Sequence, residues 1–194
     1  MELNIVQKKL SIKHTFSFHS EQLNFAFKDK SGSADFDIYY ADIPFKTSIT
    51  IERNEWLRNV GFIWILLGVI QVLIALNANR FSFNDAFWLY IGALCLIGFH
   101  FTKTAYTVFR ADVGNIFIIQ DKKHDEIMNE ITQRRKQQFL NWYSEINLNN
   151  ELEKEINKFK WLQSLNIITQ EDADNKIAQI QMANNPEFML EKKH

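Results

Sequence analysis

The chain has 194 residues, of which 46% are hydrophobic, and its 22 basic residues nearly balance its 23 acidic ones, giving a formal net charge of -1 at pH 7. This balance gives no electrostatic pull toward nucleic acid. The only cysteine is Cys95, which excludes an intramolecular disulfide and a cysteine-based metal site.

The N-terminal part of the chain alternates apolar and polar residues, as strands with one buried face do. The alternating apolar positions hold Leu10, Ile12, Phe16 and Phe18, then Leu23, Phe25 and Phe27, then Phe36, Ile38 and Tyr40. Residues 28–33 supply the chemistry of a turn, and Pro44 interrupts the third run. A further strand is expected over residues 46–52.

Two apolar runs follow, over residues 59–79 and 86–102, and neither contains Lys, Arg, Asp or Glu. A hydrocarbon core of about 30 Å needs roughly 20 helical residues to cross it. Trp88, Tyr90 and Tyr106 are placed like interfacial anchors. The runs therefore predict a transmembrane hairpin. The alternative is a buried helical pair in a soluble domain, which requires two apolar helices covered on all sides.

Basic residues near the ends of the hairpin predict its orientation. Arg53 and Arg58 precede it, Lys103 and Arg110 follow it, and the connecting link holds only Arg80. The positive-inside rule therefore places both termini in the cytoplasm. The first span is internal, so no cleavable signal peptide is predicted.

After the hairpin, short strands are expected around residues 106–109 and 116–119, with a turn between them. Two crossings return the chain to the side that it left, so these strands are expected to complete the earlier sheet. Asp121 is the expected N-cap of a long helix that reaches about Ile146 and packs on that sheet.

A strand series closed by one helix, with Gly-Asn-Ile-Phe-Ile-Ile at residues 114–119 leading into the helix, resembles the pleckstrin-homology-like (PH-like) fold. The likeness covers residues 3–145 and is closest to bacterial PH-like domains that carry membrane hairpins. It implies an α+β membrane protein of the bacterial inner membrane, whose antiparallel PH-like sheet or partial barrel is split by the hairpin. The predicted domains are residues 1–55 and 104–146 for the two PH-like parts, 56–103 for the hairpin, and 151–182 for a helical tail.

The tail reads as two short helices around a turn, over residues 155–180. Its centre, Ile-Ile-Thr-Gln-Glu-Asp at residues 167–172, resembles the SHOCT motif, a short C-terminal domain of many bacterial proteins. Thr169 is the expected N-cap, with Asp172 three residues later, and Asn166 stands where that family commonly has Gly. The resemblance implies self-association or docking, with Leu162 and Leu165 as candidate interaction residues.

Motifs of known chemistry are not found: the sequence has no phosphate-binding glycine loop, no His-Glu-x-x-His and no serine elbow. No catalytic, cofactor-binding or metal-binding residue is therefore predicted. His100 is ionisable within an apolar run, but its place near the interface favours a structural role. Arg134, Arg135 and Lys136 form a further candidate interaction cluster, although a lipid-headgroup site usually needs four or more basic residues.

Three functional hypotheses follow. The leading one is a non-enzymatic, membrane-anchored PH-like adaptor or scaffold that presents a cytoplasmic surface to a protein partner, with the tail assisting assembly. The alternative is a membrane protein that binds a lipid or small molecule between sheet and membrane. An enzyme or transporter is the third, but it lacks an acid–base constellation and has too few spans to enclose a path unless it oligomerises.

Overall fold

The computed structural model describes residues 3–29 and 32–184, so Lys30 and Ser31 of the predicted turn lie outside the described residues. Within the described residues the fold is α+β, with two antiparallel sheets and five α-helices. The first sheet has the order β1 (Leu3–Lys9), β2 (Ile12–Phe18), β3 (Gln22–Lys28) and β4 (Ser33–Tyr39), and the second has the order β5 (Ser48–Glu52), β6 (Thr104–Ala111) and β7 (Gly114–Ile119). The helices are α1 (Glu55–Asn77), α2 (Phe87–Phe101), α3 (His124–Tyr143), α4 (Leu152–Ser164) and α5 (Gln170–Ala183). A short 3₁₀ turn, η1 (Tyr40–Asp42), follows β4, and another, η2 (Phe83–Ala86), precedes α2.

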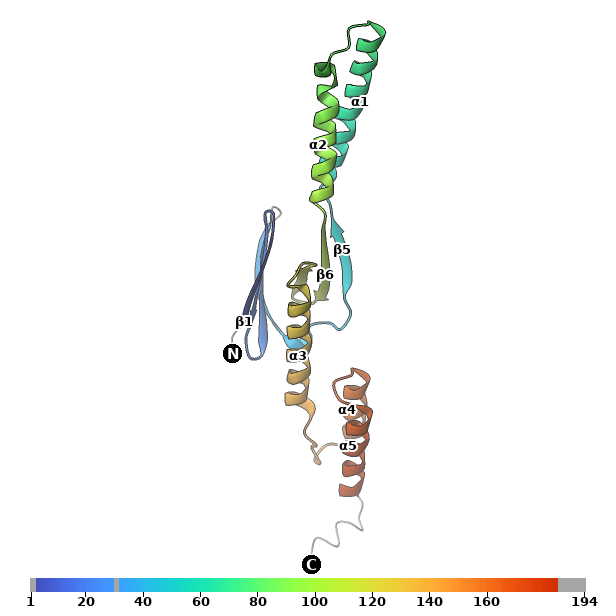
Figure 1. Ribbon diagram of the computed structural model, residues 1–194. Helices are drawn as coiled ribbons and strands as arrows, with labels where there is room; N and C mark the ends of the chain where they lie inside the picture. Colours follow the sequence, from blue (N-terminus) through green and yellow to red (C-terminus); the bar gives the residue numbers. More distant parts are fainter. Residues whose placement is uncertain (1–2, 30–31, 185–194) are drawn as a thin grey trace, which may run out of the picture. The chain divides into compact units, whose positions relative to one another are not determined.

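The chain divides into two compact units. One unit comprises residues 1–45, 110–116 and 122–194, and therefore contains the first sheet with α3, α4 and α5. The other comprises residues 46–109 and 117–121, with β5, the two hairpin helices and most of β6. In the second unit, β5 leads into α1 and α2 leads back into β6 (Figure 1).

The alternating pattern of the N-terminal residues is confirmed as the buried face of the first sheet. Phe16 pairs with Phe25 and Phe18 pairs with Leu23 across β2 and β3, and all four side chains are fully buried. The strand expected to begin at Leu10 begins instead at Ile12 as β2, because Leu10 lies in the turn between β1 and β2 with φ of 54°. Tyr40, expected to lie within the strand that Phe36 and Ile38 begin, starts the 3₁₀ turn η1 instead.

The second sheet joins strands from both sides of the hairpin, as predicted. Ile49 lies opposite Thr107, and Ile51 lies opposite Ala105, in the antiparallel pair of β5 and β6. However, the expectation of one continuous sheet is wrong, since these strands do not extend the sheet of β1–β4. The 3₁₀ turn and the loop with Pro44 separate β4 from β5, and β5 pairs with β6 instead.

The helix after β7 is shorter than expected. It begins at His124 with Lys123 at the N-cap position and ends at Tyr143, so the predicted N-cap at Asp121 and the predicted end near Ile146 are wrong. The Asp121 backbone N–H donates to the Ile119 carbonyl at 2.8 Å, in the turn that leaves β7. The two tail helices are confirmed as α4 and α5.

Candidate functional site

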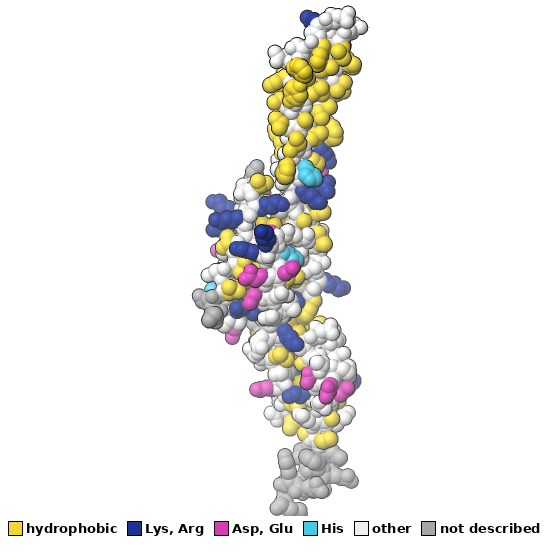
Figure 2. All heavy atoms as spheres, in the orientation of Figure 1, with side chains coloured by type: hydrophobic (Ala, Val, Ile, Leu, Met, Phe, Trp, Pro, Cys, Tyr) yellow, Lys and Arg dark blue, Asp and Glu magenta, His cyan; other side chains and the backbone are white. Residues whose placement is uncertain are grey.

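The helices α1 and α2 turn most of their large apolar side chains outward. Figure 2 shows that hydrophobic side chains cover most of the visible face of this pair between its two ends. The exposed side chains on the two helices include Phe62, Leu66, Ile70, Leu73, Ile74, Tyr90, Leu94, Ile97 and Phe101. Both helices are long and apolar enough to cross a membrane, the second when η2 is counted with it.

Glycines let the two helices approach closely. A Cβ placed on Gly68 would lie 2.6 Å from the Leu89 backbone nitrogen, and one on Gly92 would lie 2.8 Å from the Ile65 backbone nitrogen. Small residues at a helix contact allow the close backbone packing that holds helices together in an apolar solvent. Beside this contact Trp64 stacks on Trp88, with ring centroids 4.2 Å apart.

Arg134, a predicted interaction residue, ties α3 to the first sheet. Its guanidinium pairs with Glu130 at 2.8 Å and donates to the His19 carbonyl at 3.0 Å. It also lies over the rings of Phe18 and Tyr40. Burial raises the pKa of Tyr40 to about 12, although the charge of Arg134 partly offsets this rise. Arg134 therefore makes structural contacts within the chain.

Arg135 is buried and holds the loop after η1. Its guanidinium donates to the carbonyls of Ile43 at 3.2 Å and Pro44 at 3.0 Å, and it lies 4.0 Å from the centre of the Phe45 ring. Burial lowers the pKa of Arg135. Of the three predicted basic residues, only Lys136 is exposed. The helix thus disperses a cluster that is contiguous in the sequence.

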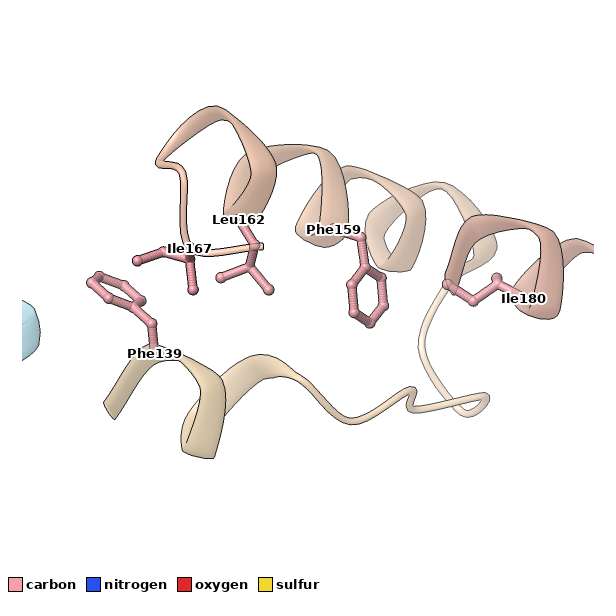
Figure 3. Close-up of a cluster of buried hydrophobic side chains, with 5 residues drawn as sticks. All are labelled: Phe139, Phe159, Leu162, Ile167 and Ile180. Atoms are coloured by element: carbon pink, nitrogen blue, oxygen red, sulfur yellow. The ribbon is translucent and has the colours of Figure 1, made fainter. Parts of the chain in front are cut away.

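The tail helices bury an apolar core against the end of α3 (Figure 3). The buried side chains are Phe139, Phe159, Leu162, Ile167 and Ile180. Leu162 is fully buried in this core, and Leu165 is half-buried at its side. Both predicted interaction residues therefore pack within the chain.

The turn between α4 and α5 has the predicted N-cap. Thr169 accepts a hydrogen bond from the Asp172 N–H, as predicted, and Asn166 has φ of 56°, the left-handed conformation expected at its position.

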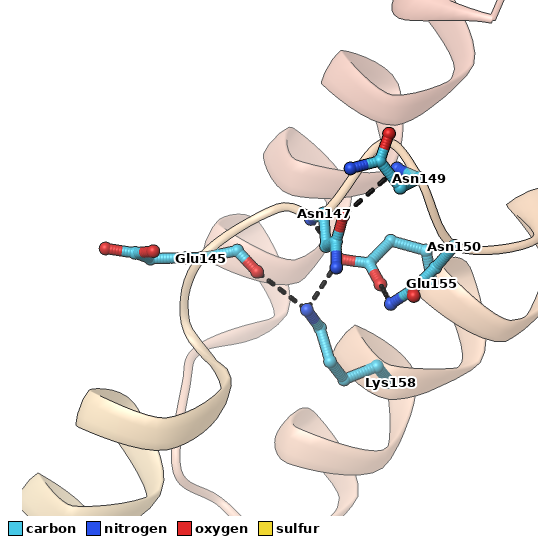
Figure 4. Close-up of polar contacts among 6 residues, drawn as sticks. All are labelled: Glu145, Asn147, Asn149, Asn150, Glu155 and Lys158. Atoms are coloured by element: carbon cyan, nitrogen blue, oxygen red, sulfur yellow. Dashed lines mark hydrogen bonds and ion pairs between the residues drawn. The ribbon is translucent and has the colours of Figure 1, made fainter.

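A buried carboxylate fastens the link between α3 and α4 (Figure 4). Glu155 is 2% exposed and accepts hydrogen bonds from the Asn147 N–H at 2.9 Å and from the Asn150 amide at 2.9 Å. It also pairs with Lys158, which donates to the Glu145 carbonyl. Burial alone would raise the pKa of Glu155, but these hydrogen bonds outweigh it and lower that pKa.

This depressed pKa predicts an acid-sensitive tail. The stabilisation from Glu155 is fully present above its unfolded pKa of about 4.3 and is lost as pH falls through the lower folded value. Glu155→Gln should lower the stability of α4 and α5 at neutral pH by about 2 kcal/mol and flatten this pH dependence. Hydrogen exchange of α4 and α5, corrected for intrinsic rates, measures both effects. If Glu155→Gln leaves the pH dependence of stability unchanged, another titrating group must cause that dependence. The carboxylate of Asp172 is the other candidate, because its hydrogen bonds with Thr169 lower its pKa, and Asp172→Asn tests it.

An exposed aromatic patch lies where β4, α3 and α4 meet. It consists of Tyr39, Trp142, Tyr143 and Trp161, which touch in that order with ring centroids 5.9, 6.2 and 5.4 Å apart. Tyr39, Trp142 and Trp161 are each exposed by 40% or more. The sequence does not mark this patch, because its members come from three separate elements.

A row of three lysines crosses the outer face of the first sheet. Lys8 lies directly opposite Lys13, and Lys13 lies directly opposite Lys28, and all three side chains are exposed. Like charges directly opposite each other destabilise a sheet. The sequence does not mark this row, because its lysines are not adjacent in the chain and meet only through the pairing of the strands. The row can be found by combining the alternation of buried and exposed residues in each strand with the register of the β1–β2 and β2–β3 pairs.

Among the described residues, no group of three or more His, Cys, Asp or Glu side chains could hold a metal ion. His14 is buried in the first sheet, with its ring against those of Phe25 and Phe27. His100 lies at the exposed end of α2 beside the ring of Phe101. Family models, curated proteins and solved structures give no match to this chain.

Proposed function

We propose that α1 and α2 anchor this chain in a membrane, with both termini in the cytoplasm, as the flanking basic residues predict. The observation that supports this best is the outward apolar surface of the hairpin, combined with glycines at the helix contact. Exposed apolar surface of this extent is costly in water and favourable in lipid. The bacterial inner membrane is the location that the PH-like resemblance implies.

The soluble part is proposed to be a non-enzymatic PH-like adaptor that presents a surface to a protein partner. In the described residues, a sheet of four strands is followed by a sheet of three strands, which the hairpin helices interrupt after β5, and then by α3. This order of elements supports the PH-like resemblance. The aromatic patch is the proposed contact surface, because exposed Trp and Tyr side chains dominate the binding energy of many protein interfaces. The buried packing of Leu162 favours the patch over the apolar face of the tail.

Membrane topology tests the anchor. A reporter inserted at Asn79 and one fused after the C-terminal residue should lie on opposite sides of the membrane, with the C-terminal reporter in the cytoplasm. The charge asymmetry around the hairpin is the physical reason. Both reporters on one side would remove the two-span anchor and the adaptor built on it.

Site-specific crosslinking tests the patch. A photoreactive amino acid at Trp142 or Trp161 should give covalent adducts in cells that express the chain at its natural level. The same group at Gln133, an exposed position of α3 outside the patch, is the matched control and should give none. Adducts that are equal at Gln133 and Trp142 would contradict a specific surface. Adducts with a second copy of the chain would identify self-association as the form of docking.

A lipid-binding function is the second candidate, and the lysine row is the observation that favours it. Three facing ammonium groups are better compensated by an anionic headgroup than by water. The turn beside the row holds Leu10, whose apolar side chain is 75% exposed and whose backbone has the left-handed conformation. Non-glycine residues rarely adopt that conformation, and backbone strain of this kind is often retained at functional sites.

The lysine row gives a prediction with two parts. Lys13→Gln removes two facing repulsions, so it should stabilise the chain by up to about 1 kcal/mol in nanodiscs of zwitterionic lipid. In anionic nanodiscs this difference should shrink or reverse, because the headgroups then stabilise the parental row. Thermal unfolding measures both parts, with Lys160→Gln on α4 as the exposed control. The same stability difference in both lipids would refute headgroup binding by the row.

A further inference from the structure

The turn between α1 and α2 is closed by its own hydrogen bonds. At its start Asn79 is left-handed, with φ of 52°, and its N–H donates to the Leu76 carbonyl at 3.0 Å. The Arg80 N–H donates to the Ala75 carbonyl at 3.1 Å. Together these bonds form a Schellman motif, which satisfies carbonyls left open at the end of α1.

The second half of the turn is closed in the same way. The Ser82 N–H donates to the Asp85 carboxylate at 2.8 Å, and the Asp85 N–H donates to the Ser82 carbonyl at 2.9 Å. Backbone donors that enter the hydrocarbon region must find partners within the protein, because acyl chains offer none. These donors already have such partners.

The turn displays two phenylalanine rings among exposed polar side chains, which are those of Asn79, Arg80, Ser82 and Asn84. Phe83 is 79% exposed and Phe81 is 45% exposed, and their rings meet edge to face with centroids 6.2 Å apart. Phe87 continues the exposed aromatic surface at the start of α2. The rings of Phe81 and Phe83 therefore lie, in the chain, just before the exposed apolar side chains of α2.

Helix length decides where this turn lies. The 15 residues of α2 rise only about 22 Å at about 1.5 Å each. That is less than a hydrocarbon core of about 30 Å. The four residues of η2 add about 8 Å at about 2 Å each, which completes the crossing. Phe83 is the first residue of η2, and it therefore reaches the far boundary of the core.

We propose that the turn lies within the far leaflet, at the boundary between headgroups and acyl chains, with Phe81 and Phe83 as its lipid anchors. This inference rests on the proposed membrane anchor. Its partner is the lipid of the far leaflet, since the exposed rings adjoin the lipid-facing surface and the backbone donors named above are satisfied within the turn. The exposed guanidinium of Arg80 then reaches the headgroups. The hairpin then presents no free aqueous loop beyond the membrane.

Spin labels test this placement in the full chain reconstituted in nanodiscs. Because Cys95 is the only cysteine, Cys95→Ala gives a background for three single-cysteine variants, Phe83→Cys, Leu94→Cys and Asn149→Cys. A nitroxide at position 83 or 94 should collide more with dissolved oxygen than with a water-soluble nickel complex. At position 149, an exposed site in the link between α3 and α4, this preference should reverse.

The outcomes separate the two proposals. A label at 83 that behaves like 149, while 94 stays in lipid, overturns the embedded turn but keeps the anchor. A label at 94 that behaves like 149 overturns the anchor itself. A label at 83 that neither relaxant reaches, with an immobilised spectrum, assigns the turn to a protein contact and also overturns the lipid placement.

Discussion

Replacing Phe25 with Ala is expected to lower the free energy of unfolding of the first sheet by about 3–5 kcal/mol. Phe25 is fully buried in β3, and its ring meets those of Phe16 at 5.0 Å, His14 at 5.6 Å and Phe36 at 5.7 Å. Truncation leaves a cavity among rings that cannot all move inward. Hydrogen exchange of β1–β4, with the chain in nanodiscs, measures the loss.

The control for this prediction is Thr15→Ala, on the outer face of the same sheet, which should change stability by about 0.5 kcal/mol or less. The extent of the effect is also informative. If Phe25→Ala weakens β5–β7 as much as β1–β4, the seven strands unfold as one cooperative unit, as the PH-like proposal and its predicted domains 1–55 and 104–146 require. If protection is lost in β1–β4 alone, the PH-like proposal fails.

The alternating strands were predictable because their signal is local. Phe16 and Phe18 in β2, and Leu23 and Phe25 in β3, occupy alternate positions of their strands and are buried, as a period of two predicts. The first strand was missed because Gln7, a polar residue that is 1% exposed, occupies a buried position in β1 and breaks the pattern. Leu10 then extended the apparent alternation into what is a turn.

Pairing between strands was less predictable, because it depends on residues far apart in the chain. In the sequence, β5 and β6 flank the two apolar helices, but nothing local shows which strand takes which edge. Helix boundaries were similarly hidden. Charged residues such as Glu55 and Arg58 end an apolar run without ending a helix, so α1 begins at Glu55, after Asn54, which caps it with its side chain.

The candidate site shows how sequence proximity misleads. Arg134, Arg135 and Lys136 are adjacent in the chain, yet a helix turns successive side chains by about 100° and sends them to different surroundings. Two of them bond to backbone carbonyls of the same unit. The three lysines of the row are not adjacent in the chain, yet the register of three strands aligns them. Side-chain contacts such as these require the pairing of elements, which no local pattern encodes.

Replacing Leu162 with Asp is expected to unfold α4 and α5 while the first sheet and the hairpin stay folded. The leucine is fully buried in the core that the tail shares with Phe139. Leu→Ala at such a site costs about 2–5 kcal/mol, and a buried carboxylate adds the cost of desolvation without a partner. The 13 residues of α4 are too few for a helix to persist once this packing is lost.

Leu152→Asp is the matched control, because it places the same carboxylate on the same helix at a position that is 40% exposed. It should leave the hydrogen-exchange protection of α4 and α5 nearly unchanged, whereas Leu162→Asp should abolish it. Light scattering of the same two variants then separates the possible roles of the tail. If Leu162→Asp abolishes an oligomer and Leu152→Asp does not, the oligomer requires the folded tail. If the oligomer persists after Leu162→Asp has unfolded the tail, it must form through another surface, because an unfolded tail cannot present a fixed helical face. Protection that survives Leu162→Asp would contradict the tail core itself, since no buried carboxylate in that position has a partner to satisfy it.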